Sequence, residues 1–187
     1  KNVKVLAVAA VGLIVFLVIV GSNQLVNPSF DARLGIDLST AGLLTTVWGI
    51  GCVAGALSGG RVMDKLGNRK ALWLSILLVV PAMILLAVVD NKVMMWAVIV
   101  FFGIAYGLSQ AVYFALAMKY TQPAIAASMY SILMAVTNIG QGIGLGLGGG
   151  LAKAAGYPVA FLVFAALMLL AIPFFPVLFG RGERAAA

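Results

Sequence analysis

The amino-acid sequence predicts an all-α membrane protein, a single bundle of six transmembrane helices arranged as two repeats of three. Three observations favour this fold class: an apolar composition, six long apolar runs, and charged residues that lie between the runs. Of the 187 residues, 64% are hydrophobic and only 9% are charged, and the mean hydropathy is +1.15. Soluble domains carry about 25% charged residues, so this chain lacks the side chains to cover a surface exposed to water.

Each apolar run is long enough to cross a bilayer, whose hydrocarbon core requires about 20 apolar residues in a helix. Groups such as Asn27-Pro28, Asp90-Asn91 and Gly156-Tyr157-Pro158 separate the runs, as helix-ending residues do. Within the single bundle 1–187, we assign 5–89 to repeat A and 93–179 to repeat B, and we expect 180–187 to form a polar cytoplasmic tail. The predicted helices are 5–26, 38–58, 71–89, 93–118, 123–149 and 158–179.

The charged residues predict the orientation of the helices. If six helices alternate in direction, one side carries nine basic and two acidic residues, a net charge of +7, and the other side carries three of each. Loops rich in Lys and Arg mark the cytoplasmic side of membrane proteins. We therefore expect an integral protein of the plasma (inner) membrane with both termini in the cytoplasm. The predicted cytoplasmic set is Lys1, Lys4, Arg61, Asp64, Lys65, Arg69, Lys70, Lys119, Arg181, Glu183 and Arg184.

The chain lacks the residues that several other functions require. Its basic residues are scattered between apolar runs, so they form no nucleic-acid-binding face. With no His and one Cys, it offers no transition-metal cluster, and we expect no cofactor. An intramembrane enzyme needs a nucleophile with its base, an acid–base pair or a metal set inside the membrane, and the spans contain none. We therefore expect a protein that is not an enzyme and whose partners are lipid and a small-molecule substrate.

Polar uncharged side chains are concentrated in the first, second, fourth and fifth predicted helices, whereas the third and sixth are almost wholly apolar and should face lipid. This order of polar, polar, apolar repeats in both halves, as in a 3+3 repeat. The alternative for each polar residue is an interhelical hydrogen bond that only holds the bundle together, worth about 0.6 kcal/mol. The residues that we expect to line a solute cavity are Asn23, Gln24, Asn27, Tyr106, Gln110, Tyr113, Asn138 and Gln141.

Glycines recur at every fourth position in the second and fifth predicted helices. Small residues at this spacing let helix backbones approach closely in lipid. The simple interpretation is helix packing, and the density of glycines in the fifth helix is also typical of a helix that bends or slides. The packing positions are Gly51 and Gly55 in the second helix and Gly140, Gly144 and Gly148 in the fifth.

A polar stretch between the second and third helices has the pattern G-x-x-x-D-x-x-G-x-R-K, carried by Gly60, Asp64, Gly67, Arg69 and Lys70. Its charges and irregular backbone would be unsatisfied in hydrocarbon, so we expect a hinge over 59–70 at the cytoplasmic surface. Six spans with this loop resemble one half of a major facilitator superfamily (MFS) transporter. Two departures and one likeness favour the second half. The fourth helix lacks an arginine, the fifth lacks a Gly-Pro pair, and 129–142 resembles the family's eleventh helix.

The resemblance implies transport of a small solute by alternating access. It implies a second six-helix bundle as partner, which is either the missing half of the same chain or a second copy. It also implies that Asp64 and Arg69 form a cytoplasmic gate with that bundle, where the carboxylate meets the positive ends of helix dipoles. The alternative for this pair is a local contact that stabilises the turn. The alternative for the whole chain is a membrane scaffold or subunit that transports nothing.

Overall fold

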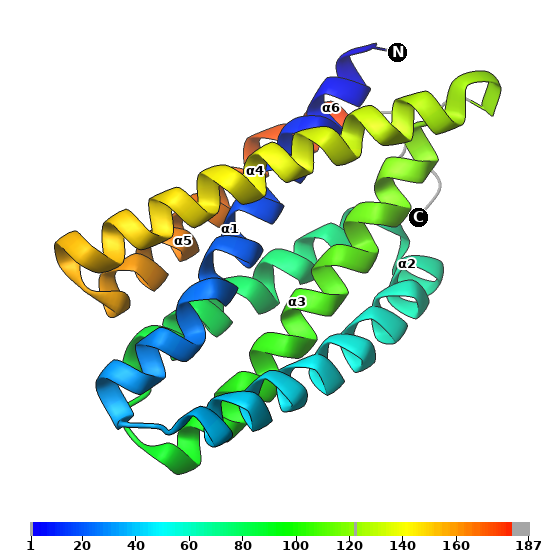
Figure 1. The fold of residues 1–187 in the computed structure, drawn as a ribbon. Helices are drawn as coiled ribbons and strands as arrows, with labels where there is room; N and C mark the ends of the chain where they lie inside the picture. Colours follow the sequence, from blue (N-terminus) through cyan, green and yellow to red (C-terminus); the bar gives the residue numbers. More distant parts are fainter. Residues whose placement is uncertain (1, 122, 181–187) are drawn as a thin grey trace.

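The computed structural model describes residues 2–121 and 123–180, and within these ranges the regular structure is entirely helical. Five segments are long and apolar enough to cross a membrane: α1, α2, α3, α4 and the stretch Tyr157–Leu178, which includes both α5 and α6. The predicted all-α fold class is thereby confirmed. The bounds are α1 Asn2–Leu34, α2 Leu38–Val88, α3 Lys92–Tyr120, η1 Pro123–Ile125, α4 Ala126–Ala155, α5 Tyr157–Leu169, η2 Ile172–Phe174 and α6 Phe175–Leu178 (Figure 1).

Helix α2 turns back on itself. A straight helix of its 51 residues would be about 75 Å long. Its two ends nevertheless lie together, because Arg33 just before it donates hydrogen bonds to the carbonyl oxygens of Leu86 (2.9 Å), Ala87 (3.0 Å) and Val89 (2.5 Å) at its far end. The reversal occurs at Gly67, where φ is 75° and ψ is 165°. Figure 1 shows the first segment (38–66) and the second segment (68–88) running in opposite directions.

The expected twelve-residue hinge is therefore wrong in its extent. The backbone is helical through residue 66 and again from residue 68, so only Gly67 leaves the helical region. The reason lies in the side chains before it, since Met63, Lys65 and Leu66 are all good helix formers. Gly67 reaches the positive φ without the steric cost that a Cβ would impose.

Two further helix ends differ from the expectation. Helix α1 continues past Asn27-Pro28 to Leu34, because neighbouring helices in a membrane bundle can compensate for the hydrogen bond that a proline removes. It ends instead just before Gly35, whose φ is 57°. The predicted helix 158–179 breaks after Leu169 into η2 and α6, because Pro173 and Pro176 cannot donate backbone hydrogen bonds there.

The other two predicted breaks are confirmed. Asn91 caps α3, since its side-chain oxygen accepts a hydrogen bond from the Met94 backbone N–H at 2.8 Å. Gly156, with a φ of 86°, lies between α4 and α5. Before α2, the exposed Asp37 side chain accepts a hydrogen bond from the Thr40 N–H at 3.1 Å. The hydrogen bonds from Thr40 hold the pKa of Asp37 below its ordinary value.

The most extensive helix contacts join α2 to α3 and α1 to α4. Glycines lie at both. A methyl group at Gly51 would lie 2.9 Å from the Val100 carbonyl oxygen of α3, and one at Gly55 would overlap the Ile104 carbonyl. On α4, methyl groups at Gly140 and Gly144 would overlap carbonyl oxygens of α1. Backbone therefore packs directly on backbone in both pairs, as small residues allow.

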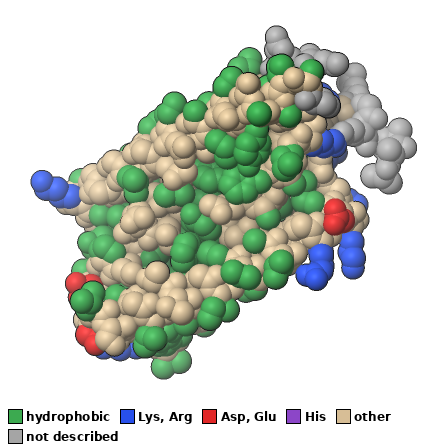
Figure 2. Space-filling view, turned by 45° about the vertical axis from the view of Figure 1, so that its right-hand side comes forward, with side chains coloured by type: hydrophobic (Ala, Val, Ile, Leu, Met, Phe, Trp, Pro, Cys, Tyr) green, Lys and Arg blue, Asp and Glu red, His purple; other side chains and the backbone are tan. Residues whose placement is uncertain are grey.

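The described charged side chains lie at the two ends of the bundle. Figure 2 shows them at opposite ends of the face that it draws, with apolar and uncharged groups between them. At the Lys70 end, the Lys4 ammonium lies 5.7 Å from the centre of the Tyr120 ring, and the Tyr120 hydroxyl donates to the Leu178 carbonyl oxygen at 2.9 Å. At the Lys92 end, the Lys92 ammonium donates to the Gly35 carbonyl oxygen at 3.3 Å.

The Lys70 end carries six basic residues and one acidic residue among those described, and the Lys92 end carries three of each. The first set is Lys4, Arg61, Asp64, Lys65, Arg69, Lys70 and Lys119, and the second is Asp31, Arg33, Asp37, Asp90, Lys92 and Lys153. Lys1, Arg181, Glu183 and Arg184, and with them the expected tail after Gly180, lie outside the described residues.

Candidate functional site

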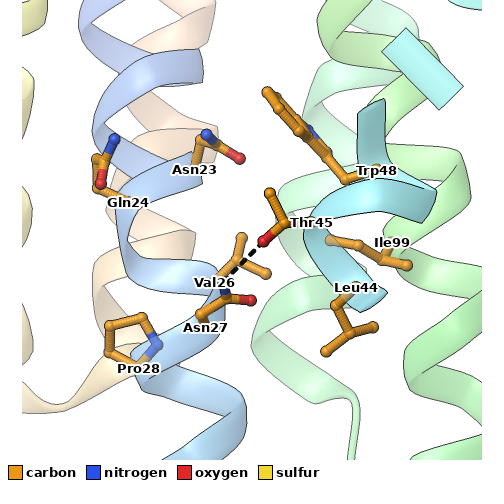
Figure 3. A pocket seen from close by; sticks show the side chains of 9 residues that line it. All are labelled: Asn23, Gln24, Val26, Asn27, Pro28, Leu44, Thr45, Trp48 and Ile99. Atoms are coloured by element: carbon orange, nitrogen blue, oxygen red, sulfur yellow. Dashed lines mark hydrogen bonds between the residues drawn. The ribbon is translucent and has the colours of Figure 1, made fainter. Parts of the chain in front are cut away.

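A cavity of about 320 Å³ lies between α1, the first segment of α2 and α3 (Figure 3). Its volume is at the lower end of the roughly 300–1,000 Å³ that is typical of small-molecule sites. One hydrogen bond crosses it, from the Asn27 side-chain amide to the Thr45 hydroxyl at 3.1 Å. Thr45 in turn donates to the Ala41 carbonyl oxygen at 3.0 Å. The lining residues are Asn23, Gln24, Val26, Asn27, Pro28, Leu44, Thr45, Trp48 and Ile99.

The polar groups of the cavity are uncharged. No described residue forms a hydrogen bond with the side-chain amides of Asn23 or Gln24. Each of these amides carries two N–H donors and one carbonyl acceptor. The cavity can therefore bind a neutral, hydrogen-bonding group, and it has no charged side chain to bind an ion directly.

An aromatic wall connects this cavity to two more of the predicted residues. Trp48 lines the cavity, and its ring meets Tyr106 edge to face, with 5.1 Å between the ring centres. Behind it, the Gln110 side-chain amide donates to the Tyr106 hydroxyl at 3.3 Å. The indole nitrogen of Trp48 is buried and has no hydrogen-bond partner among the described residues. Trp48 is thus an aromatic surface on the cavity side and a support for Tyr106 on the other.

The remaining predicted residues lie elsewhere. Tyr113 is fully buried between α1 and α3, where its ring meets Phe16 edge to face at 5.4 Å and fills the space over Gly12. Its hydroxyl has no hydrogen-bond partner in the described part of the chain. On α4, the Gln141 amide donates to the Asn138 carbonyl oxygen at 3.0 Å, and neither residue lines the cavity.

Sequence reasoning did not place Thr45 and Trp48 among the cavity residues. They stand three positions apart in the second predicted helix, so helical periodicity puts them on one face. A polar residue and an aromatic residue at this spacing on a predicted membrane helix could therefore have been predicted to line the same cavity. An aromatic side chain in an apolar run is otherwise indistinguishable from a core residue.

The residues of the G-x-x-x-D-x-x-G-x-R-K pattern lie at the Lys70 end. Asp64, Arg69 and Lys70 are exposed, and within residues 2–121 and 123–180 none of the three forms a hydrogen bond or ion pair. Asp64 and Arg69 lie on opposite sides of the reversal at Gly67. Both charges therefore remain available to a partner outside the described residues.

The comparisons with known proteins agree with this architecture. A family model described as the Major Facilitator Superfamily matches residues 7–187. This chain belongs to the major facilitator superfamily. The MFS chain is therefore a membrane protein with transmembrane helices, and its family is one of transporters. No curated protein sequence matches it.

The MFS chain is also similar to a solved structure of a bacterial homologue of the human drug peptide transporters PepT1 and PepT2. The TM-score is 0.81 at 20% sequence identity. The match covers 99% of this chain and 42% of the transporter chain, so the MFS chain spans less than half the length of that protein. At this identity, the likeness identifies the fold.

Proposed function

We propose that this MFS chain forms one six-helix half of a transporter that moves a small, neutral solute across the plasma (inner) membrane by alternating access. The observation that carries this proposal is the match of nearly the whole chain to 42% of a transporter of the same fold. A second six-helix bundle completes the central cavity, supplied by the rest of a longer chain or by a second copy. We favour the second half of such a chain.

The packing of the helices supports six membrane crossings in a 3+3 repeat. If α2 crosses twice, the crossings are α1 and both segments of α2 in repeat A, followed by α3, α4 and α5–α6 in repeat B. The first segment of α2, which is the second crossing of repeat A, packs on α3, the first crossing of repeat B. In the same way α4, the second crossing of repeat B, packs on α1, the first crossing of repeat A. The third crossings pack on each other, since Trp73 of the second segment of α2 meets Phe175 of α6 edge to face, with 5.0 Å between the ring centres. Exchanging the two repeats leaves this set of contacts unchanged, as a twofold internal repeat requires.

The glycines follow the same exchange. In repeat A, the second crossing carries Gly51 and Gly55, which pack on the backbone of α3. In repeat B, the second crossing carries Gly140 and Gly144, which pack on the backbone of α1. Equivalent positions therefore use the same close approach of two backbones, and this supports the division at about residues 89–93.

Charge supports the orientation. The Lys70 end has a clear excess of basic residues, and the Lys92 end is balanced. The rule that basic loops stay in the cytoplasm puts the Lys70 end, and with it both termini, on the cytoplasmic side. Asp64 and Arg69 then face the cytoplasm, where Asp64 can bind the second bundle and close the cavity on that side.

The cavity of Asn23, Asn27, Thr45 and Trp48 is the proposed contribution of this half to the solute site. Its amides and hydroxyl bind donors and acceptors of the solute, and the Trp48 ring packs against an apolar face of it. Tyr106 and Gln110 hold Trp48 in position. Since no charged side chain lines the cavity, a neutral solute is favoured over an ion.

The test uses the complete transporter in proteoliposomes, with uptake of a panel of neutral sugars, amides and short peptides as the measurement. Asn23→Leu should abolish uptake of the solute that wild type accepts, while Thr46→Val, a change at an exposed polar residue of α2 that does not line the cavity, should retain most of it. If the Asn23→Leu variant keeps full uptake, the cavity is not part of the solute site. Asp64→Asn separates transporter from scaffold, since a transporter should lose flux while inserting normally and a scaffold should be unaffected.

A further inference from the structure

We propose that a groove between the second segment of α2 and α6 binds an anionic phospholipid from the membrane leaflet at the Lys70 end. The groove is separate from the solute cavity and has a volume of about 150 Å³. This is well below the roughly 300–1,000 Å³ of sites that enclose a small molecule, so the groove suits part of a longer ligand. Its lining residues are Arg69, Trp73, Ile172, Phe175, Pro176 and Phe179.

The body of the groove is apolar and aromatic. Trp73 meets Phe175 edge to face at 5.0 Å, and Phe175 meets Phe179 in the same way at 6.1 Å. The two phenylalanines are buried and form its base, whereas the Trp73 side chain remains 43% exposed. The break between α5 and α6 at Pro173 shapes the opposite wall. These side chains offer a surface for an acyl chain or the glycerol region of a lipid.

One end of the groove carries a cation. Arg69 is exposed and has no hydrogen-bond or ion-pair partner among the described residues. No acidic residue lines the groove. A guanidinium binds phosphate oxygens through two parallel N–H donors. The arrangement of one guanidinium above an apolar surface therefore matches a phosphate headgroup above its hydrocarbon chain.

The position of the groove favours a lipid over a solute. The second segment of α2 and α5 form the outer, apolar part of the bundle, with Leu77, Ile84 and Leu162 exposed on it. Such a surface faces hydrocarbon in a membrane protein. Tryptophan is enriched at the membrane–water boundary, and the cytoplasmic leaflet carries anionic lipids that attract basic residues. The excess of basic residues at this end supplies the complementary charge.

Fluorescence quenching can test this site directly. In a Trp48→Phe/Trp96→Phe background, Trp73 is the only tryptophan among these 187 residues and reports on the groove; any tryptophan in the rest of a longer chain is replaced in the same way. The protein is reconstituted in two vesicle preparations, each containing phosphatidylglycerol and phosphatidylcholine at equal mole fraction. The acyl chains of phosphatidylglycerol are brominated in one preparation, and those of phosphatidylcholine are brominated in the other. We expect Trp73 to prefer the anionic lipid about fivefold, the size of effect given by one basic residue near an anionic surface. Arg69→Gln should remove the preference.

The matched control is Arg61→Gln, which removes an exposed basic side chain of the same end that does not line the groove. It should leave the preference intact, and circular dichroism checks that each variant is folded. Equal quenching by both lipids in the parent protein would overturn the proposal, as would equal losses in the Arg69 and Arg61 variants. Quenching that appears only in a variant ending at Gly180 would also overturn it, because the chain's own tail would then occupy the groove.

Discussion

Two helix pairs in this protein use the same packing device to different degrees. Where the first segment of α2 meets α3, both helices carry glycines: Gly51 and Gly55 pack on α3, and Gly103 and Gly107 pack on α2. Where α4 meets α1, the ladder of glycines on α4 packs mainly on the backbone at Leu13 and Leu17, with Gly21 as the glycine facing it. The first contact is therefore reciprocal along its length, and the second is largely one-sided.

The two glycine-bearing helices are alike on their other face, which is open in both. Of the most apolar stretch of α4, only 28% is buried inside the protein, and in the first segment of α2 the buried residues are Leu44, Gly51, Gly55 and Gly59 alone. On α4, methyl groups at Gly142, Gly146, Gly149 and Gly150 would meet nothing within 4 Å. Helix α4 and the first segment of α2 are thus each attached along one narrow face and open along the other. These are the helices best placed to pack against the proposed second bundle.

The largest expected effect is at the reciprocal contact. Gly55→Leu would drive a side chain into the Ile104 carbonyl, and α2 cannot tilt away because Gly107 on α3 is equally close to Cys52. Overpacking a tight contact costs about 3 kcal/mol, and here the neighbour is backbone, which cannot adjust by a rotamer change. We expect little folded protein, measured by thermal melting and gel filtration in detergent. Gly49→Leu on the open face of the same helix is the matched control and should fold normally.

The one-sided contact should tolerate the same change better. Gly144→Leu also overlaps a backbone carbonyl, that of Leu17, but α1 offers mainly Gly21 in return, so α4 is held less tightly than α2 and can shift away. We expect a loss of about 2 kcal/mol, smaller than at Gly55 and measured in the same melts. Gly146→Leu should leave the melting temperature unchanged and reduce transport by the complete protein. Equal losses at Gly55 and Gly144 would contradict the distinction between the two contacts.

Most of this fold could be predicted from the sequence, because apolar length and glycine spacing are local properties. The failures all concern the positions at which helices end. Pro28 and the residues before Gly67 were interpreted by their local tendency to end a helix or form a loop, whereas neighbouring helices and good helix formers carried the helix through. The break after Leu169 follows from Pro173 and Pro176, which the length of the apolar run concealed.

The candidate site was predictable only in part. Asn23, Gln24 and Asn27 lie together because they are neighbours on one helix. Tyr106 and Tyr113 share a face of α3 but stand seven residues apart, which is about 10 Å along the helix. One therefore reaches Trp48, and the other is buried against Phe16. A periodic pattern gives direction around a helix and does not say which neighbour lies at each level.

The next effect concerns the contact between α1 and the second segment of α2. Arg33 on α1 donates three hydrogen bonds to the carboxyl-terminal end of α2, and its positive charge is attracted to the negative end of the helix dipole there. Arg33→Gln should destabilise the protein by about 1.5 kcal/mol, since hydrogen bonds to a charged group each contribute about that much and glutamine can replace some of them. Arg33→Lys should lose less. A melting temperature unchanged in Arg33→Gln would mean that these three hydrogen bonds contribute nothing to stability.

The smallest expected effect on stability lies in the solute cavity, where Asn27 on α1 donates to Thr45 on α2 and so joins the two pairs. A double-mutant cycle with Asn27→Ala and Thr45→Val should give a coupling energy of about 0.6 kcal/mol, the average for hydrogen bonds between membrane helices. If the cavity binds solute, each single variant should weaken solute binding by much more than this coupling, because bound solute is expected to use the same amide and hydroxyl. A coupling of several kcal/mol with unaltered solute binding would make the pair a structural clamp between the helix pairs. A small coupling with lost binding would make the contact a resting arrangement that solute replaces.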